Sequence, residues 1–271
     1  MGLAQEVSSD RDELRSLGGI PPDFQRYLGT AHEVCVAPLW SVGRQAHVGC
    51  VIHGYKDTKG RWRRASEAGE VEAALARIAS IAAEEKETGS ANLIVLPVHY
   101  EVIRRPTRFY AFLRRIKELP LDVARRLTIE LVAIPRGHPN HLLLEKVRSL
   151  SGSAKQVVLR AYGVEDLGTR IRAIGIKSVT FDFNSIGVLG HGQREKQLAE
   201  IIACAHRLKL TTLVFGVGSL HGLTTCLAAG VDFLSGPVTS IPGLKFSGGQ
   251  IIPAGALYKA IAARLASHEL V

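Results

Sequence analysis

The hydrophobic pattern of this chain alternates between short continuous apolar runs and longer segments in which apolar residues recur every three or four positions. Runs of the first kind, such as 127–134 (LTIELVAI) and 212–216 (TLVFG), are typical of strands buried on both faces of a parallel sheet. Segments of the second kind are typical of amphipathic helices that pack on such a sheet. The repeated succession of strand and helix therefore predicts a mostly parallel α/β fold.

The individual elements follow from these two patterns and from the residues that end each segment. The sequence predicts strands at 33–42, 46–55, 91–98, 127–134, 156–161, 176–183, 212–216 and 231–235. It predicts helices at 66–87, 107–119, 140–150, 164–174, 194–208, 220–229 and 254–266. Loops are expected at 56–64, which is basic, and at 184–193, which contains glycine. Only Gly43, Arg44 and Gln45 separate the first two strands, so these strands are predicted to form an antiparallel hairpin.

The number of strand–helix units indicates a closed barrel. The chain has 271 residues, a length typical of a single (β/α)8 barrel of the TIM type. No GxGxxG motif follows the first strand, which argues against a Rossmann fold. We therefore predict an α/β fold with one TIM-like barrel domain over 31–271, whose first strand is antiparallel. A short helical arm over 1–30 precedes it, with helices at 9–17 and 21–28.

The segment 210–243 is the most completely specified unit of the chain. It predicts a strand, a helix and a second strand, and Gly230 is expected to end the helix in the left-handed conformation. In barrels of this type the loops that follow the strands carry the chemistry. The corresponding loops here, 216–219 and 235–236, hold no acid, base or metal ligand. The unit therefore predicts the fold without offering reactive groups.

Composition adds a strong positive charge to this picture. The formal net charge is +9, with basic clusters at 56–64, 104–117 and 125–126. A basic balance suits an acidic protein, a nucleotide or a nucleic acid, although most charge runs are solvated faces. The aromatic residues within 104–117 recur at helical spacing, which favours core packing over the stacking platform of a single-strand binder. We therefore expect no nucleic-acid ligand.

The cysteines and the apolar runs bear on location. Cys35, Cys50, Cys204 and Cys226 are far apart and form no CxxC pair, so neither a zinc site nor a disulfide framework is indicated. The N-terminal segment has no apolar signal core, and no apolar run reaches the length of about 18 residues that a membrane span needs. We expect a cytoplasmic chain with no membrane span and no cofactor.

Two carboxylates stand out because apolar strands contain them. Glu130 lies within a buried run, where a charge must face a pocket or pair with another charge. It is either a ligand-facing or metal-binding group, or the partner of a buried arginine, most simply Arg160 on the next strand. Asp182 ends its strand at the end of the barrel where sites lie. A guanidinium among these groups would repel a divalent cation, so no metal site is predicted.

Other candidate groups carry weaker signals. His138 and His141 could ligate a metal at i,i+3, but no third ligand accompanies them, which favours a surface pair. The segment 187–192 (GVLGHG) resembles a phosphate-binding loop, but it lacks the Gly-Lys-Ser/Thr ending. No GxSxG elbow is present. None of these features predicts a catalytic site.

Four segments, LTIEL at 127–131, VVLRAYG at 157–163, SVTFD at 178–182 and the strand–helix–strand unit at 212–236, resemble motifs of EAL domains, the cyclic di-GMP phosphodiesterase family. LTIEL at 127–131 resembles the family's L-T/R-L-E-I/L strand, and SVTFD at 178–182 resembles its L-K-I-D strand. VVLRAYG at 157–163 resembles its A-L-D-D-F-G strand. The segment 212–236 resembles V-V-A-E-G-V-E, a helix, G-C-D and Q-G, and its Gly-Val-Asp followed by glycine is the most specific match. The resemblance runs from about Glu33 to the C-terminus and implies the EAL-type barrel with its antiparallel first strand.

The resemblance also places unlike residues at most of the family's catalytic positions. Glu130 and Asp182 match the family's metal-binding Glu and its Asp. At the other positions the residues differ. Val51 stands at the signature Glu, Pro97 at the metal-binding Asn, and Arg160 and Ala161 at the paired Asp residues. Thr180 stands at the Lys, Phe215 and Gly218 at the two later Glu residues, and Ser235 at the Gln. Because the family uses divalent metals to activate water against a phosphodiester, the resemblance implies a degenerate member without hydrolytic activity. The family's ligand-binding Arg falls near Tyr55, which argues against cyclic di-GMP binding.

We therefore interpret the chain as a degenerate, bacterial EAL-like domain that regulates signalling through an unidentified protein partner. Its basic surface suits an acidic partner, and a homodimer is left open. One alternative is a non-hydrolytic sensor of cyclic di-GMP or another anion at the barrel mouth, where Glu130, Arg160 and Asp182 remain as a vestigial pocket. Another is a hydrolase that uses Glu130 and Asp182 in a new metal site. A mouth that is open and basic would favour a sensor; Phe215 and Tyr162 are the side chains expected to fill it.

Overall fold

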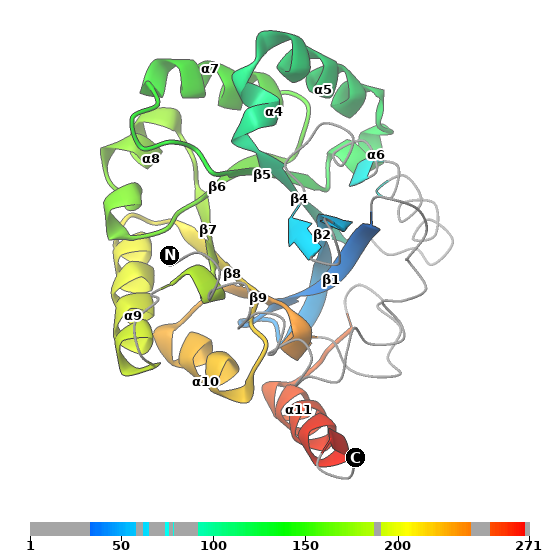
Figure 1. Cartoon of the computed structure of the whole chain (residues 1–271), viewed down its shortest axis with the longest axis vertical. Helices are drawn as coiled ribbons and strands as arrows, with labels where there is room; N and C mark the ends of the chain where they lie inside the picture. Colours follow the sequence, from blue (N-terminus) through cyan, green and yellow to red (C-terminus); the bar gives the residue numbers. More distant parts are fainter. Residues whose placement is uncertain are drawn as a thin grey trace.

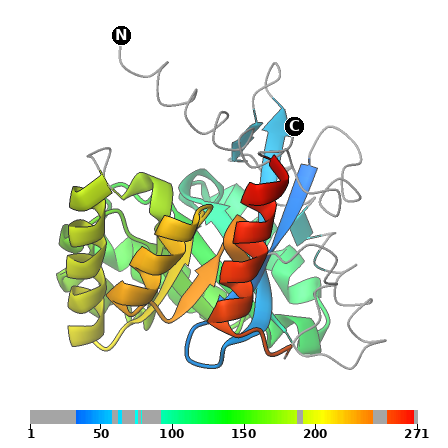
Figure 2. The same ribbon diagram turned by 90° about the horizontal axis from the view of Figure 1, so that it is seen from below.

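A computed structural model describes residues 33–57, 62–64, 74–75, 78, 92–186, 191–239 and 250–268. The predicted arm over 1–30 and most of the predicted helix over 66–87 lie outside these residues. In the described part, helices surround a central ring of strands (Figure 1). Figure 2, which views the molecule from below, shows α9, α10 and α11 side by side along the outside of the ring.

The strands occupy the positions of the predicted apolar runs, with shifts of a few residues at their ends. They are β1 Glu33–Ser41, β2 Ala46–Asp57, β3 Trp62–Arg64, β4 Leu93–His99, β5 Leu127–Val132, β6 Gln156–Arg160, β7 Ser178–Asp182, β8 Thr211–Phe215 and β9 Phe233–Ser235. The helices are α4 Tyr100–Arg104, α5 Pro106–Glu118, α6 Leu121–Ala124, α7 Asn140–Ser151, α8 Thr169–Ile174, α9 His191–Arg207, α10 Leu220–Ala229 and α11 Ala254–His268. Short 3-10 helices are η1 Val164–Leu167, η2 Phe183–Ser185 and η3 Pro237–Thr239.

The strands form one closed barrel. The sheet has nine strands in the order β1-β9-β8-β7-β6-β5-β4-β2-β3, and a further pairing between β1 and β2 closes the ring. β3 pairs with β2 outside the ring, which leaves eight barrel strands. β1 is antiparallel to both β2 and β9, whereas every other neighbouring pair in the ring, from β2–β4 round to β8–β9, is parallel. The predicted hairpin and the predicted TIM-like barrel with an antiparallel first strand are confirmed.

Two apolar layers hold the barrel together because successive residues of each strand point to opposite faces. The larger layer lies between the strands and the helices and includes Trp40, Phe109 and Phe181, all buried. The smaller cluster contains Leu39, Val51, Val95, Leu213 and Phe215, with Val48, Leu93 and Phe233 packed against it. These residues come from β1, β2, β4, β8 and β9, so side chains from strands on opposite sides of the ring meet in its interior.

Three local predictions differ from the structure, and two short helices were not predicted. The expected basic loop over 56–64 instead contains the end of β2 and the strand β3. The helix predicted over 164–174 is divided at Gly168 into η1 and α8. The loop over 184–193 begins with η2 and ends inside α9, whose first residue is His191. The short helices α4 and α6 are too brief to produce a helical period in the sequence, and they were not predicted.

The unit formed by β8, α10 and β9 has the predicted order, and its caps explain its motif. Gly230 has φ 78° and ends α10 in the left-handed conformation, while the Ser219 side chain accepts a hydrogen bond from the Gly222 backbone N–H and begins it. The carboxylate of Asp232 accepts hydrogen bonds from the backbone N–H and the hydroxyl of Thr212, each at 2.8 Å. The Gly-Val-Asp motif is therefore a structural clamp between β8 and β9.

None of the helices in the described residues is long and apolar enough to cross a membrane.

Candidate functional site

The candidate residues lie on barrel strands or in the loops that directly follow them. Pro97 is opposite Glu130 across β4 and β5. Arg160 is opposite Thr180 across β6 and β7, and Asp182 is opposite Phe215 across β7 and β8. Val51 is opposite Val95 across β2 and β4, and Ser235 is opposite Leu39 across β9 and β1. The carboxyl ends of these parallel strands gather at one end of the barrel, where sites form in this architecture.

The centre of this group is a buried ion pair between Glu130 and Arg160. The Arg160 Nε donates to Glu130 Oε1 at 2.7 Å, and its terminal Nη2 donates to Oε2 at 2.9 Å. The Thr180 hydroxyl also donates to Oε1. The side chains of Glu130 and Arg160 are 0% and 4% exposed. Of the two interpretations of Glu130, the structure confirms the partner of a buried arginine.

This ion pair decides whether the residues present fit a divalent metal. A bidentate arginine occupies both oxygens of the carboxylate that a metal would need. The guanidinium brings a full positive charge to the same place, where it repels a second cation in a poorly screened environment. In addition, the described residues contain no group of three His, Cys, Asp or Glu side chains that could hold a metal ion. The residues at the end of the barrel do not fit the metal centre that the EAL resemblance implies.

Phe215 fills the barrel interior beside the ion pair. Its ring is fully buried, and the Arg160 guanidinium carbon lies 5.4 Å from the ring centre. That distance is within the range of a cation–π contact, which is favourable when the cation is desolvated. Val51 belongs to the same inner cluster as Phe215. The two positions at which the sequence resemblance places family carboxylates, Val51 and Phe215, therefore hold buried apolar side chains of one inner cluster.

Asp182 has a local structural role. Its carboxylate caps the N-terminus of η2 by accepting a hydrogen bond at 3.2 Å from the backbone N–H of Asn184. It also lies close to the backbone of Gly216, where an added Cβ would be 3.1 Å from Asp182 Oδ1. Gly216 has φ 73°, a conformation that glycine adopts without strain. The turn after β8 therefore folds directly over the Asp182 carboxylate.

The remaining candidate positions contribute little chemistry. Ala161 belongs to the outer apolar layer, and its backbone N–H donates to the Thr180 carbonyl at 2.9 Å. Pro97 and Gly218 are half-buried. Ser235 is buried, and its hydroxyl has no hydrogen-bond partner among the described residues. The structure brings Glu130, Arg160, Thr180 and Phe215 together and leaves Ala161 outside the group.

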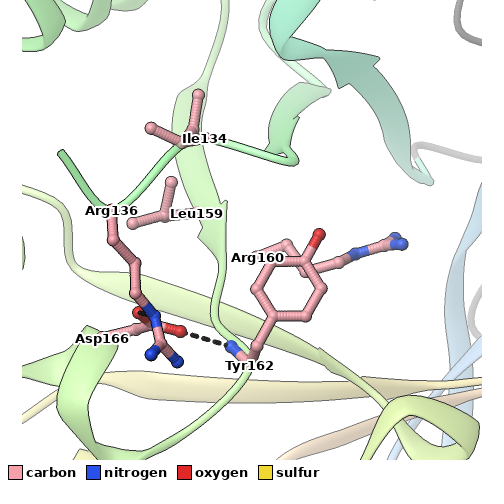
Figure 3. Close-up of a pocket in the computed structure, with 6 residues that line it drawn as sticks. All are labelled: Ile134, Arg136, Leu159, Arg160, Tyr162 and Asp166. Atoms are coloured by element: carbon pink, nitrogen blue, oxygen red, sulfur yellow. Dashed lines mark hydrogen bonds and ion pairs between the residues drawn. The ribbon is translucent and has the colours of Figure 1, made fainter. Parts of the chain in front are cut away.

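A polar clamp at the barrel mouth was only partly anticipated from the sequence, which pointed to Tyr162 alone. The Tyr162 hydroxyl accepts a hydrogen bond from the Ala133 backbone N–H at 3.2 Å. The Tyr162 backbone N–H donates to Asp166 Oδ2 at 2.8 Å, and Arg136 Nε lies 3.5 Å from Asp166 Oδ1 (Figure 3). Arg136 also pairs with Glu165. The clamp joins the loop after β5 to the loop after β6. In the sequence, the feature that could have indicated it is the presence of charged residues in these two consecutive loops at one end of the barrel.

The clamp surrounds a small hollow beside the ion pair. Its lining is Ile134, Arg136, Leu159, Arg160, Tyr162 and Asp166 (Figure 3). The hollow measures about 30 Å³, which is room for one or two water molecules. Burial raises the pKa of Tyr162, and the nearby charge of Arg160 partly opposes this rise. Tyr162 is therefore a neutral phenol that lines the hollow together with Arg160, with 41% of its surface exposed.

The rings of His138 and His99, near this end of the barrel, each form a hydrogen bond. The His138 Nδ1 is hydrogen-bonded to the Tyr100 hydroxyl at 3.0 Å, and the two rings meet edge to face with centroids 5.1 Å apart. The His99 Nδ1 accepts a hydrogen bond from the Glu101 backbone N–H at 3.2 Å and begins α4. The sequence predicted a surface pair of His138 and His141; in the structure the ring partner of His138 is Tyr100.

Comparison with known proteins identifies the fold. No protein-family model matches the chain, and no curated protein matches its sequence. Solved structures do match. The Bacillus subtilis YkuI protein, with an EAL domain, in complex with substrate cyclic di-GMP and calcium, superimposes with a TM-score of 0.60 at 13% identity, over 87% of this chain and 60% of that one. The PaMucR phosphodiesterase in complex with cyclic di-GMP gives 0.57 at 14% identity, over 93% and 99%.

A third match has a similar score. The Vibrio cholerae LapD S helix-GGDEF-EAL structure superimposes with a TM-score of 0.56 at 14% identity, over 88% of this chain. This chain spans 57% of the LapD structure and 60% of YkuI. At such low identities the likeness establishes the fold and nothing more specific. The antiparallel first strand, the closed ring and these superpositions together show that the chain has the barrel fold of EAL domain proteins.

Proposed function

We propose that this chain is a catalytically inactive EAL-like domain that regulates signalling through a protein partner. The observation that carries the proposal is the ion pair of Glu130 and Arg160. Glu130 matches the family's metal-binding Glu, and both of its oxygens accept hydrogen bonds from one buried arginine. Because the fold is kept while this carboxylate is neutralised by Arg160, we propose that the domain acts by binding a protein on its surface and not by catalysis.

Hydrolysis of a phosphodiester by this architecture requires metals that polarise the phosphate and activate water. A metal at Glu130 would have to displace Arg160, which would then be buried without a counter-ion at a cost of several kcal/mol. Phe215 and Val51 replace further carboxylates with buried apolar side chains. We therefore propose that no divalent ion binds and that cyclic di-GMP is not cleaved.

A second candidate function is a non-hydrolytic sensor of cyclic di-GMP or another anion. The observation in its favour is Arg136, whose side chain is largely exposed at the mouth next to Tyr162. The structures of YkuI, PaMucR and Xanthomonas citri FimX contain cyclic di-GMP. Against it, Arg160 is bound to Glu130 through both Nε and Nη2, and the hollow beside it has room for only one or two water molecules. Calorimetry with cyclic di-GMP in the absence of metal tests this candidate, and no heat together with no thermal shift at high ligand concentration would exclude it.

The leading proposal is tested in the organism that carries the gene, by a variant that changes the barrel interior and leaves the surface unchanged. The chain is deleted, and the signalling output that changes is restored by wild type and by a Glu130→Leu/Arg160→Met variant. We expect both to restore it, because the variant removes the charges while keeping an apolar interior. Failure of a stably folded double variant would mean that the pair takes part in the activity. Absence of any signalling change on deletion would also count against the proposal.

A further inference from the structure

We propose that the seam between α5 and α7 binds an acidic amphipathic helix of a partner protein. The inference rests on the proposed protein-binding function and names the surface and the chemistry of the partner. The seam surface is defined by residues from both helices: Tyr110, Arg114 and Lys117 of α5, and Leu142 and Lys146 of α7.

Lys146 connects the two helices across the seam. Its Nζ lies 4.1 Å from the centre of the Phe109 ring and 5.7 Å from the centre of the Tyr110 ring. Phe109 is buried, so the ammonium and its aliphatic stem cover the aromatic floor between the helices. Figure 1 shows α5 and α7 next to each other on the outside of the barrel. Because a flexible lysine covers this floor, a partner can displace its ammonium without disturbing the core.

Two large side chains of the seam surface are exposed, Tyr110 on α5 and Leu142 on α7. Tyr110 is 57% exposed and Leu142 is 42% exposed. On α7, Leu142 and Lys146 are four residues apart, and on α5, Tyr110 and Arg114 have the same spacing, so each pair lies on one helix face. A tyrosine and a leucine on neighbouring helices are suitable anchors for the apolar stripe of a third helix.

The charges around these anchors are mostly positive. α5 contains four basic residues, and Glu118 is its single carboxylate. Glu118 is shared, since Arg114 lies 3.8 Å from it and Arg115 lies 3.2 Å from it. Lys117 and Lys146 carry no carboxylate partner in the described part of the chain. A surplus of cations around two apolar anchors favours a partner whose apolar stripe is flanked by Asp and Glu.

A nucleic acid fits the same surface less well. Glu118 on α5 and Glu145 on α7 stand among the basic residues and would repel phosphates. The face of Tyr110 toward Lys146 is partly occupied by the ammonium, which limits stacking of a base. Leu142 offers an apolar contact that a phosphate backbone cannot use. The mixture of anchors and interspersed charges is that of a protein interface.

The test measures binding of a defined probe to the full chain. The probe is a fluorescein-labelled amphipathic peptide of about 20 residues with Leu at i, i+3, i+4 and i+7 and Glu at the flanking positions. Two control peptides replace all Glu by Gln or all Leu by Ser. The protein variants are Tyr110→Ser/Leu142→Ser and, as a matched control, Ile251→Ser, because Ile251 is a 74% exposed apolar residue elsewhere on the barrel. Unchanged melting temperatures establish that the variants fold.

The expected result is saturable binding that weakens about tenfold in Tyr110→Ser/Leu142→Ser, which corresponds to about 1.4 kcal/mol, and is unchanged in Ile251→Ser. Both control peptides should bind more weakly. The inference is overturned by no binding at about 1 mM peptide, a concentration at which even weak complexes form, or by equal binding to the seam variant. It is also overturned if a single-stranded oligonucleotide of equal charge binds the seam as tightly as the peptide. If the Glu130→Leu/Arg160→Met variant still restores the signalling output in those cases, the proposed regulatory function stands and only the seam surface is excluded. Failure of the seam proposal can therefore be told apart from failure of the proposed function.

Discussion

Replacing Arg160 by methionine should destabilise the barrel far more than replacing both members of its ion pair. In wild type, Glu130 and Arg160 are buried and joined by two hydrogen bonds of 2.7 and 2.9 Å. The Arg160→Met variant leaves the Glu130 carboxylate buried with only the Thr180 hydroxyl donating to it among the hydrogen bonds described above. The double variant Glu130→Leu/Arg160→Met instead leaves an apolar side chain at each position, next to Phe215.

The magnitude follows from the burial of the pair. Breaking a buried ion pair by removing one partner costs about 3–5 kcal/mol, whereas replacing both partners with apolar residues of similar volume is often neutral. The single variant should therefore melt about 6–20 °C below wild type, at about 2–4 °C for each kcal/mol in a domain of this size. The double variant should stay within about 2 kcal/mol of wild type.

The assay is urea unfolding followed by circular dichroism, with calorimetric melting as a second measurement, on wild type, both single variants and the double variant. The double-mutant cycle isolates the coupling between the two side chains. An Arg160→Met variant within 1 kcal/mol of wild type, a threshold well below the cost expected for a broken buried pair, would refute the reasoning. So would single-variant effects that simply add in the double variant.

Three further predictions concern residues away from the ion pair. Burial lowers the pKa of His47, whose Nε2 is hydrogen-bonded to the Thr239 carbonyl. Because the His47 ring takes up a proton more readily in the unfolded chain, the free energy of unfolding should fall as the pH decreases through about 6.5. His47→Gln should reduce that acid sensitivity in unfolding measured between pH values of about 5 and 8, and an unchanged pH slope would contradict this. Gly236→Ala should cost at least about 3 kcal/mol, because a Cβ would lie 2.6 Å from the Val217 backbone N and O. Gly230→Ala, with open space around its Cβ, should cost only about 1 kcal/mol for its left-handed conformation, and equal losses would be inconsistent with this account. Asp232→Ala removes both hydrogen bonds to Thr212 and should cost about 1–3 kcal/mol in urea unfolding, while binding at the α5–α7 seam stays the same.

The barrel could be predicted from the sequence because its strands are buried on both faces. A run such as 127–132 is apolar throughout except for Glu130 and Thr128, and such runs are hard to place outside a parallel sheet. The ion pair could be suggested from the sequence because Glu130 and Arg160 belong to consecutive strands, but a ligand-facing carboxylate was an equally good interpretation of Glu130. Burial cost alone could not decide between that pair and a ligand-facing carboxylate, whereas the bidentate geometry does.

The rest of the site depends on contacts that no local pattern records. The hydrogen bond of Thr180 to Glu130 joins residues 50 positions apart. The clamp of Arg136, Tyr162 and Asp166 is set by the turn conformations of two loops, including Ala133 with φ 59°, which single residues do not specify. The break between η1 and α8 at Gly168 likewise depends on tertiary contacts, because the apolar spacing over 164–174 is compatible with one continuous helix.

Our central proposal is that the barrel end occupied by the Glu130–Arg160 pair and Phe215 does not carry out the metal-dependent chemistry of the EAL family. Its most direct test is incubation of the purified full chain with cyclic di-GMP and Mg²⁺ or Mn²⁺, followed by chromatographic detection of the linear dinucleotide product. The account predicts no product above the protein-free control. Metal-dependent turnover by wild type that disappears in Glu130→Gln would contradict it.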